Sequence, residues 1–144
     1  IEQTISRIRQ RGERDAEGVM LWLGRRSAEG SAVYEAYEPF YQSKADQFIV
    51  PPQGMSALMD RICATGYAVV AQVHSHPEHA FHSAADEKWA LVKHVGAYSI
   101  VLPWFCARTT AENFWHEAAV FVMQPDGRWL QLSAREKESK CLTQ

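Results

Sequence analysis

The chain of 144 residues has a formal charge of -2, from 15 Lys and Arg against 17 Asp and Glu. Both signs are mixed along the sequence, which argues against nucleic acid or an anionic membrane surface as the main partner. One domain of this length buries about two thirds of its unfolded surface without disulfides or a structural metal, so a metal ion here would serve chemistry.

The cysteines Cys63, Cys106 and Cys141 are odd in number and form no C-x-x-C pair. Free thiols in a reducing compartment are therefore expected. The longest uninterrupted apolar segment, Ala118 to Met123, is far too short to span a bilayer, and no signal-like segment opens the sequence. We expect a soluble, cytoplasmic protein.

The first half of the chain contains alternating helix and strand patterns. Isoleucines at helical spacing predict a short amphipathic helix within residues 1–12. The apolar run Val19 to Leu23 is typical of a strand buried on both faces, closed by Gly24. Weak alternation of apolar and polar residues predicts a strand at Ser31 to Tyr37. The segment Glu38 to Gln47 has no regular pattern and predicts a loop.

A strand, a helix and another strand are predicted next. Phe48 to Val50 is a short strand, and the apolar residues from Met55 to Cys63 fit the helical template, with Gly66 at the C-cap position. Tyr67 to His74 is again an apolar strand. This order favours an α/β fold in which helices flank a central mixed β-sheet.

The second half is predicted to begin with a helix from Ser83 to Gly96, followed by a strand at Tyr98 to Leu102. Phe105 to Glu112 predicts a loop, and Asn113 to Met123 predicts a long strand.

The C-terminal residues predict a turn at Pro125-Asp126-Gly127 and a strand at Trp129 to Leu132. Residues 1–132 are therefore assigned to one domain, and 133–144 to a polar tail with frayed structure.

The stretch His74-Ser75-His76-Pro77 places two histidines one residue apart at the end of an apolar strand. Alternate side chains of a strand share a face, so both imidazoles can reach one ion, and the proline ends the strand. Zinc binds imidazole nitrogen and carboxylate oxygen, and a hydrolytic site keeps one position for water. With Asp86, the two histidines would supply three protein ligands.

Each of these residues also has a simpler interpretation. Ser83 and Asp86 precede an apolar-periodic run as in a capping box, where Asp86 would only complement the helix dipole. Glu17 alone would be an ordinary solvated glutamate. Four histidines within nine residues are also compatible with a surface tract that binds metals loosely: His74, His76, His79 and His82.

Taken together, the pattern resembles the JAMM (MPN-type) zinc metalloproteases across most of the chain. Their signature is a glutamate, then His-x-His-Pro, a short loop and Ser-x-x-Asp. The matching segments are Glu17 in Glu-Gly-Val-Met-Leu-Trp-Leu-Gly, His74-Ser75-His76-Pro77, and Ser83-Ala84-Ala85-Asp86. The order of helices and strands resembles the compact prokaryotic JAB branch, which implies a single-domain JAMM/MPN fold of the cytidine-deaminase-like kind.

The resemblance implies that His74, His76 and Asp86 bind one Zn²⁺ per chain and that Glu17 hydrogen-bonds the zinc-bound water. Zinc lowers the pKa of its water to about 7, so a carboxylate can take the proton and later deliver it to the leaving amine. Ser83, beside the metal, would stabilise the oxyanion.

The loop from Glu78 to His82 has five residues, where the family usually has six. If the missing residue shifts the register, His82 becomes the alternative third ligand and Asp86 reverts to a capping role. We favour Asp86, because a loop loses a residue more easily than a helix start changes its role.

The family also implies a substrate. Its members are isopeptidases or peptidases that cleave after the C-terminus of a ubiquitin-like protein in a conjugate or precursor, and bacterial members often accompany ubiquitin-like conjugation systems, some in antiphage defence. The expected partners are a ubiquitin-like protein, its conjugates, and the cognate activating and conjugating enzymes. An extended tail adding as a strand would suit such a site, with the globular part on loops 38–47 and 105–112.

Three other classes are less compatible with the sequence. A scaffold that retains the fold without catalysis would have a damaged ligand set, whereas all five motif residues are present. A nucleobase deaminase needs His-x-Glu together with Pro-Cys-x-x-Cys, and the sequence has no Pro-Cys-x-x-Cys. Phosphoryl transfer has no support, because the chain lacks a glycine-rich phosphate loop.

Overall fold

The computed structural model describes residues 1–27, 30–43 and 48–139. Its centre is a six-stranded mixed sheet in the order β2-β1-β5-β6-β7-β8, in which only β5 and β6 run parallel. The strands are β1 (Val19–Ser27), β2 (Gly30–Tyr37), β5 (Ala68–Ser75), β6 (Tyr98–Leu102), β7 (Ala119–Met123) and β8 (Trp129–Gln131). A separate two-stranded hairpin joins β3 (Gln42–Ser43) to β4 (Phe48–Ile49).

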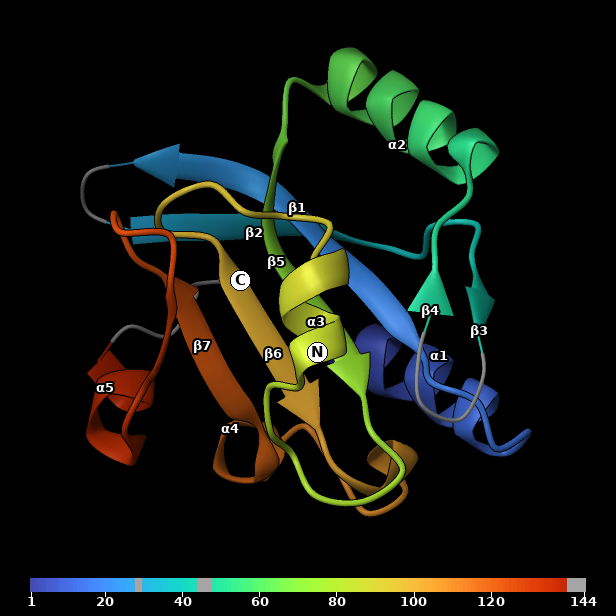
Figure 1. Ribbon diagram of the computed structural model, residues 1–144, viewed down its shortest axis with the longest axis vertical. Helices are drawn as coiled ribbons and strands as arrows, with labels where there is room; N and C mark the ends of the chain where they lie inside the picture. The colour runs from blue at the N-terminus through green and yellow to red at the C-terminus, as the bar shows by residue number, and fades with distance from the viewer. Residues whose placement is uncertain (28–29, 44–47, 140–144) are drawn as a thin grey trace.

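Helices cover both faces of the sheet, as Figure 1 shows. They are α1 (Glu2–Gly12), α2 (Pro52–Thr65), α3 (Ala84–Trp89), α4 (Phe114–Glu117) and α5 (Ala134–Ser139), with a 3-10 turn η1 (Trp104–Cys106). On one face, Ile5 and Ile8 of α1 pack with Trp22 of β1. On the other, Leu58 of α2 packs with the alternate β1 residues, including Leu21. The prediction of a mixed sheet flanked by helices is confirmed.

Strand β2 ends at Tyr37 as predicted, but β1 is longer than the sequence prediction. Gly24 does not close β1, which continues to Ser27 and pairs with β2. The register shifts between Leu23 and Gly24, where an added Cβ would lie 1.8 Å from the carbonyl oxygen of Ala32. The glycine therefore permits a close approach at a bulge rather than ending the strand. The exposed, polar end of the strand carries no apolar pattern that would reveal it.

The segment predicted as a loop, Glu38 to Gln47, contains strand β3, and its residues 44–47 lie outside the described part. Strand β3 pairs with β4 over only two residues on each side. A hairpin this short has too few positions for a period of two to be visible in the sequence.

The helix predicted from Ser83 to Gly96 ends at Trp89. Val92 is buried but Val95 is half exposed, so the two valines do not share one helical face. The backbone N–H of Leu91 instead donates to the Gln72 side chain of β5, which satisfies it without a helix.

The long strand predicted from Asn113 to Met123 begins only at Ala119, because residues 114–117 form helix α4. Phe114 is fully buried and stacks on Trp22 with ring centroids 5.8 Å apart, while the adjacent Trp115 also meets Trp22, edge-on at 6.0 Å. Neighbouring residues that both contact one ring are incompatible with a strand, whose side chains alternate.

The C-terminal tail, predicted to be frayed, contains α5. Ser133 and Glu136 form reciprocal hydrogen bonds at its start, and Lys137 Nζ donates to the carbonyl oxygens of Trp115 and Ala118. Capping and one lysine stabilise this helix without an apolar stripe, so periodicity could not predict it. Among the described residues, no helix has the length and apolar character needed to cross a membrane.

Candidate metal site

The segment that carries Glu17 lies beside the end of β5 because of the antiparallel register of β1 and β5. Val19 pairs with His74, and Ser75 N donates to Gly18 O at 3.1 Å while Gly18 N donates to Ser75 Oγ at 3.1 Å. Extending this register by one more pair sets Glu17 opposite His76. Opposed residues of an antiparallel pair share a face, so Glu17, His74 and His76 all lie on the α2 and α3 side of the sheet.

Asp86 reaches the same place from the first turn of α3. Ser83 caps this helix: its Oγ accepts the Asp86 N–H at 3.1 Å, and its own N–H donates to Asp86 Oδ2 at 2.7 Å. This reciprocal capping box fixes the carboxylate toward β5. The capping role that the sequence left open is thus present, and it aims Asp86 at the histidines.

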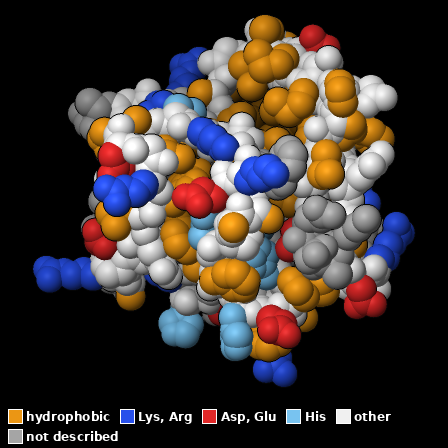
Figure 2. Space-filling view, viewed as in Figure 1, with side chains coloured by type: hydrophobic (Ala, Val, Ile, Leu, Met, Phe, Trp, Pro, Cys, Tyr) orange, Lys and Arg blue, Asp and Glu red, His pale blue; other side chains and the backbone are white. Residues whose placement is uncertain are grey.

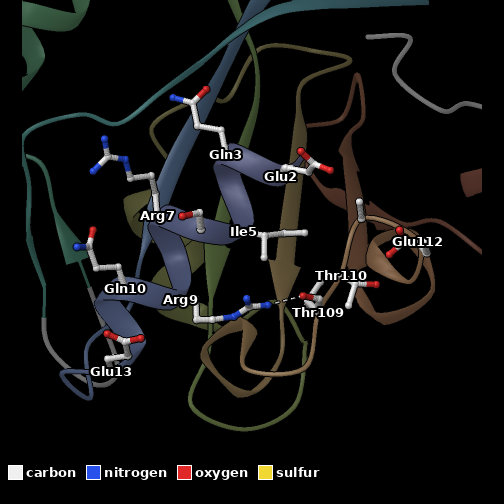
Figure 3. Close-up of a pocket in the computed structure, with 12 residues that line it drawn as sticks. Glu2, Gln3, Ile5, Arg7, Arg9, Gln10, Glu13, Thr109, Thr110 and Glu112 are labelled. Atoms are coloured by element: carbon white, nitrogen blue, oxygen red, sulfur yellow. Dashed lines mark hydrogen bonds between the residues drawn. The ribbon is translucent and has the colours of Figure 1, made fainter.

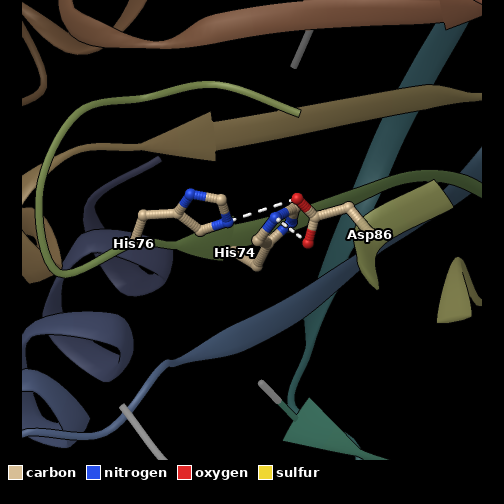
Figure 4. Close-up of side chains that lie close together, drawn as sticks. All are labelled: His74, His76 and Asp86. Carbon is tan, nitrogen blue, oxygen red and sulfur yellow. Dashed lines mark ion pairs between the residues drawn. The ribbon is translucent and has the colours of Figure 1, made fainter. Parts of the chain in front are cut away.

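His74, His76 and Asp86 point toward one another in Figure 4. Nε2 of His74 lies 3.0 Å from Asp86 Oδ1, and Nε2 of His76 lies 3.3 Å from Asp86 Oδ2. One potential ligand atom from each residue lies within 4.8 Å of the others, and all three residues are buried.

The donor set fits a zinc ion. Zinc binds imidazole nitrogen and carboxylate oxygen, and these are the atoms that the two histidines and Asp86 bring together. His74 is 0% exposed; its Nε2 lies 3.0 Å from Asp86 Oδ1, and its Nδ1 has no hydrogen-bond partner among the described residues. A buried polar atom without a partner is costly. These residues can therefore hold a metal ion.

The carboxyl group of Asp86 is ionised at neutral pH. Burial opposes its ionisation, but the neighbouring imidazoles of His74 and His76 and the N–H of Ser83 hold the pKa of Asp86 well below its usual range. The carboxylate is the form that binds a cation.

Glu17 lies beside this group rather than in it. It is 2% exposed, and its Oε1 lies 3.8 Å from His76 Nε2. A carboxylate at this distance is adjacent to the ligand atoms without joining them. The hydroxyl of Ser83, which accepts the Asp86 N–H, can still donate its proton.

His82, the alternative third ligand, does not join the group of ligand atoms. Its ring contacts Phe121 and Trp129, with centroids 4.9 and 5.3 Å apart. Burial lowers the pKa of His82, so the side chain is neutral at pH 7. The ring of His79 meets Trp104 instead, at 5.1 Å.

Sequence reasoning missed two kinds of supporting residue. Ser75 joins the two segments through Gly18, and its position between the histidines was the only signal of this role. Phe48 and Tyr41 are buried next to the site, with the Phe48 ring 5.8 Å from that of His74. Tyr41 directly precedes β3, and Phe48 is the first residue of β4. These two strands are too short to show a period of two in the sequence.

On the face seen in Figure 2, histidine side chains are visible among hydrophobic ones below the hydrophobic group over α2. A separate open pocket of about 860 Å³ lies between α1 and residues 109–112, and Figure 3 shows its polar lining. Arg9 donates to the Thr109 carbonyl oxygen there at 2.6 Å. None of the five predicted site residues lines this pocket.

A scan against protein-family models finds no match. The chain is 29% identical over 116 residues to the probable metalloprotease y4jG of Sinorhizobium fredii (strain NBRC 101917 / NGR234), covering 78% of this chain and 70% of that protein.

Two solution structures have a similar fold. Protein DSY2949 from Desulfitobacterium hafniense has a TM-score of 0.65 at 19% identity, covering 91% of this chain and 84% of its own. A protein from Salinibacter ruber (strain DSM 13855) has a TM-score of 0.53 at 14% identity, covering 91% and 85%. At these identities the similarity concerns the fold alone.

Proposed function

We propose that this chain is a zinc-dependent peptidase or isopeptidase of the JAMM/MPN type. The observation that carries the proposal is the buried group of His74, His76 and Asp86, with the Glu17 carboxylate 3.8 Å from His76. The similarity to a protein named as a probable metalloprotease supports the same class of reaction. His74, His76 and Asp86 would hold the ion, and imidazole and carboxylate donors suit zinc.

Each residue of the candidate site has a role in this proposal. Zinc, when bound, would acidify a water molecule and polarise the scissile carbonyl group. Glu17 accepts the proton at its carboxylate and passes it to the leaving amine. Ser83 donates its hydroxyl proton to the negative charge that develops on the carbonyl oxygen. The low accessibility of the site strengthens these charge interactions.

We propose a ubiquitin-like protein as the substrate, cleaved after its C-terminal tail, with a bacterial ubiquitin-like conjugation system as the context. Support comes from the match of the motif residues to the family and from the β3–β4 hairpin, whose Phe48 contacts His74. Phe40, which precedes this hairpin, and Ile49 of β4 are 59% and 49% exposed, which provides apolar surface for a protein substrate.

The test is cleavage of a ubiquitin-like protein fused through its C-terminal tail to a reporter protein. A ubiquitin-like protein from a bacterial conjugation system is the first choice. Mass spectrometry should place the cut directly after the tail, and chelation should abolish the cut. Equal cleavage of unstructured peptides would point to a general peptidase, and activity that persists in chelator would contradict the metal mechanism.

A further inference from the structure

Tyr41 occupies a position where strand β2 has already ended. The last pair between β1 and β2 is Leu21 with Tyr37, so β2 offers no partner to the beginning of β1. Gly18 directs its N–H and C=O toward Ser75, and the groups of the next residue, Val19, therefore face the opposite side. The Tyr41 hydroxyl accepts the buried Val19 N–H there, at 3.3 Å.

The ring of Tyr41 connects to the other half of the site. Tyr41 is 7% exposed and meets Phe48 edge-on, with centroids 6.4 Å apart and an angle of 81°. Phe48 in turn lies against the imidazole of His74 at 5.8 Å. Tyr41 thus contacts the backbone at Val19, two residues after Glu17. Through Phe48 it also supports His74, a candidate ligand.

Helix α1 fixes this ring from outside. The Arg11 guanidinium lies 4.9 Å from the centroid of the Tyr41 ring, and Arg11 also pairs with Glu38 at 3.2 Å. Cation-aromatic contact and the ion pair together limit rotation of the tyrosine. Burial raises the pKa of Tyr41, so its hydroxyl is neutral at pH 7 and can accept from the Val19 N–H.

We propose that Tyr41 is a positioning residue, whose hydroxyl holds the backbone at Val19 and thereby keeps the Glu17 carboxylate in register with His76. This inference rests on the proposed function, in which Glu17 moves the proton. The hydroxyl then affects the proton-transfer step, whereas the ring, through Phe48, affects the orientation of His74.

Tyr41→Phe separates the two contacts, because it keeps the ring and removes the acceptor. With the fusion substrate we expect kcat to fall about 10- to 100-fold, the usual range for a partner that orients a site residue. KM should stay within about twofold, and zinc stoichiometry should not change, since Tyr41 is buried and is not among the candidate ligands. Tyr98→Phe is the matched control, because burial also raises the pKa of this half-buried tyrosine and it pairs with Ala71 and Val122, away from the site.

A double-mutant cycle distinguishes positioning from general destabilisation. If Tyr41 acts through Glu17, adding Tyr41→Phe to Glu17→Gln should leave the residual turnover of the single variant nearly unchanged. If the reductions in turnover caused by the two single substitutions multiply in the double variant, the proposal is wrong.

Amide hydrogen exchange in the metal-free protein tests the contact without any activity. Exchange at Val19 should accelerate at least about tenfold in Tyr41→Phe, while core amides of β6 and β7 keep their rates. Unchanged exchange at Val19 would overturn the inference even in an active enzyme. Conversely, accelerated exchange in a protein that hydrolyses nothing would reject the proposed function while leaving the structural contact established.

Discussion

Glu17 and Asp86 are both buried acidic residues at one site, but they meet the histidines differently. Asp86 approaches both imidazoles, at 3.0 and 3.3 Å, whereas the Oε1 atom of Glu17 lies 3.8 Å from Nε2 of His76. Asp86 also accepts the Ser83 N–H, which fixes its orientation. In the proposed function the two carboxylates therefore have different roles, Asp86 as a ligand and Glu17 as a proton carrier.

Glu17→Gln should keep the fold and zinc but remove most turnover. The amide has the shape of the carboxylate and cannot accept the proton, and loss of a general base typically costs about 10²- to 10⁴-fold. Steady-state kinetics together with zinc analysis of the same sample measure both quantities. Turnover near the wild-type rate would show that Glu17 is only a neighbour of His76.

Asp86→Ala should lose zinc and activity, whereas His82→Ala should keep both. The reason is geometric: Asp86 lies among the ligand atoms, and His82 packs on Phe121 and Trp129. Zinc content after equilibrium dialysis is the measurement. The reverse outcome, with zinc retained only in Asp86→Ala, would identify His82 as the third ligand.

At the scale of elements, α3 depends on its cap because the helix has only six residues. Helices this short are marginal without capping or tertiary contacts. The Ser83–Asp86 box therefore serves both stability and placement of the candidate ligand. Helix α5 begins with a similar pair, Ser133 and Glu136, away from the metal site.

These two caps allow a matched test of Ser83. Ser83→Ala and Ser133→Ala should each lower the free energy of unfolding by about 0.5–2 kcal/mol, the usual loss for an N-cap. Only Ser83→Ala should also reduce kcat, by about 10²- to 10³-fold, because it removes a donor to the oxyanion. Denaturant unfolding and kinetics on both variants provide the comparison. Equal kcat values in the two variants would limit Ser83 to capping.

The sequence predicted the elements with strong periodicity and missed those stabilised by individual contacts. Helix α2 and its left-handed Gly66 cap, with φ of 67°, agree with the prediction. In contrast, α4 depends on Phe114 packing against Trp22, and the end of α3 depends on the contact between Leu91 and Gln72. Contacts between residues this far apart in the sequence leave no local pattern.

At the scale of the whole molecule, the candidate site combines three separate segments of the chain. The register of β1 and β5 brings Glu17 to His76, and the capping box of α3 adds Asp86. The motif predicted these residues, but Tyr41 and Phe48 could not be predicted, because their roles arise only when the hairpin folds against β1 and β5. That the site binds zinc remains a prediction.

Metal analysis of wild type and His76→Ala, after metal removal and equilibration with zinc, tests the central claim most directly. Three ligands from a strand end and a capped helix form a preorganised site, so we expect about one tightly bound zinc per wild-type chain. His76→Ala should lose this zinc while keeping the fold, as judged by circular dichroism. A wild-type chain that binds no zinc, or a folded His76→Ala that binds it as tightly, would contradict the account.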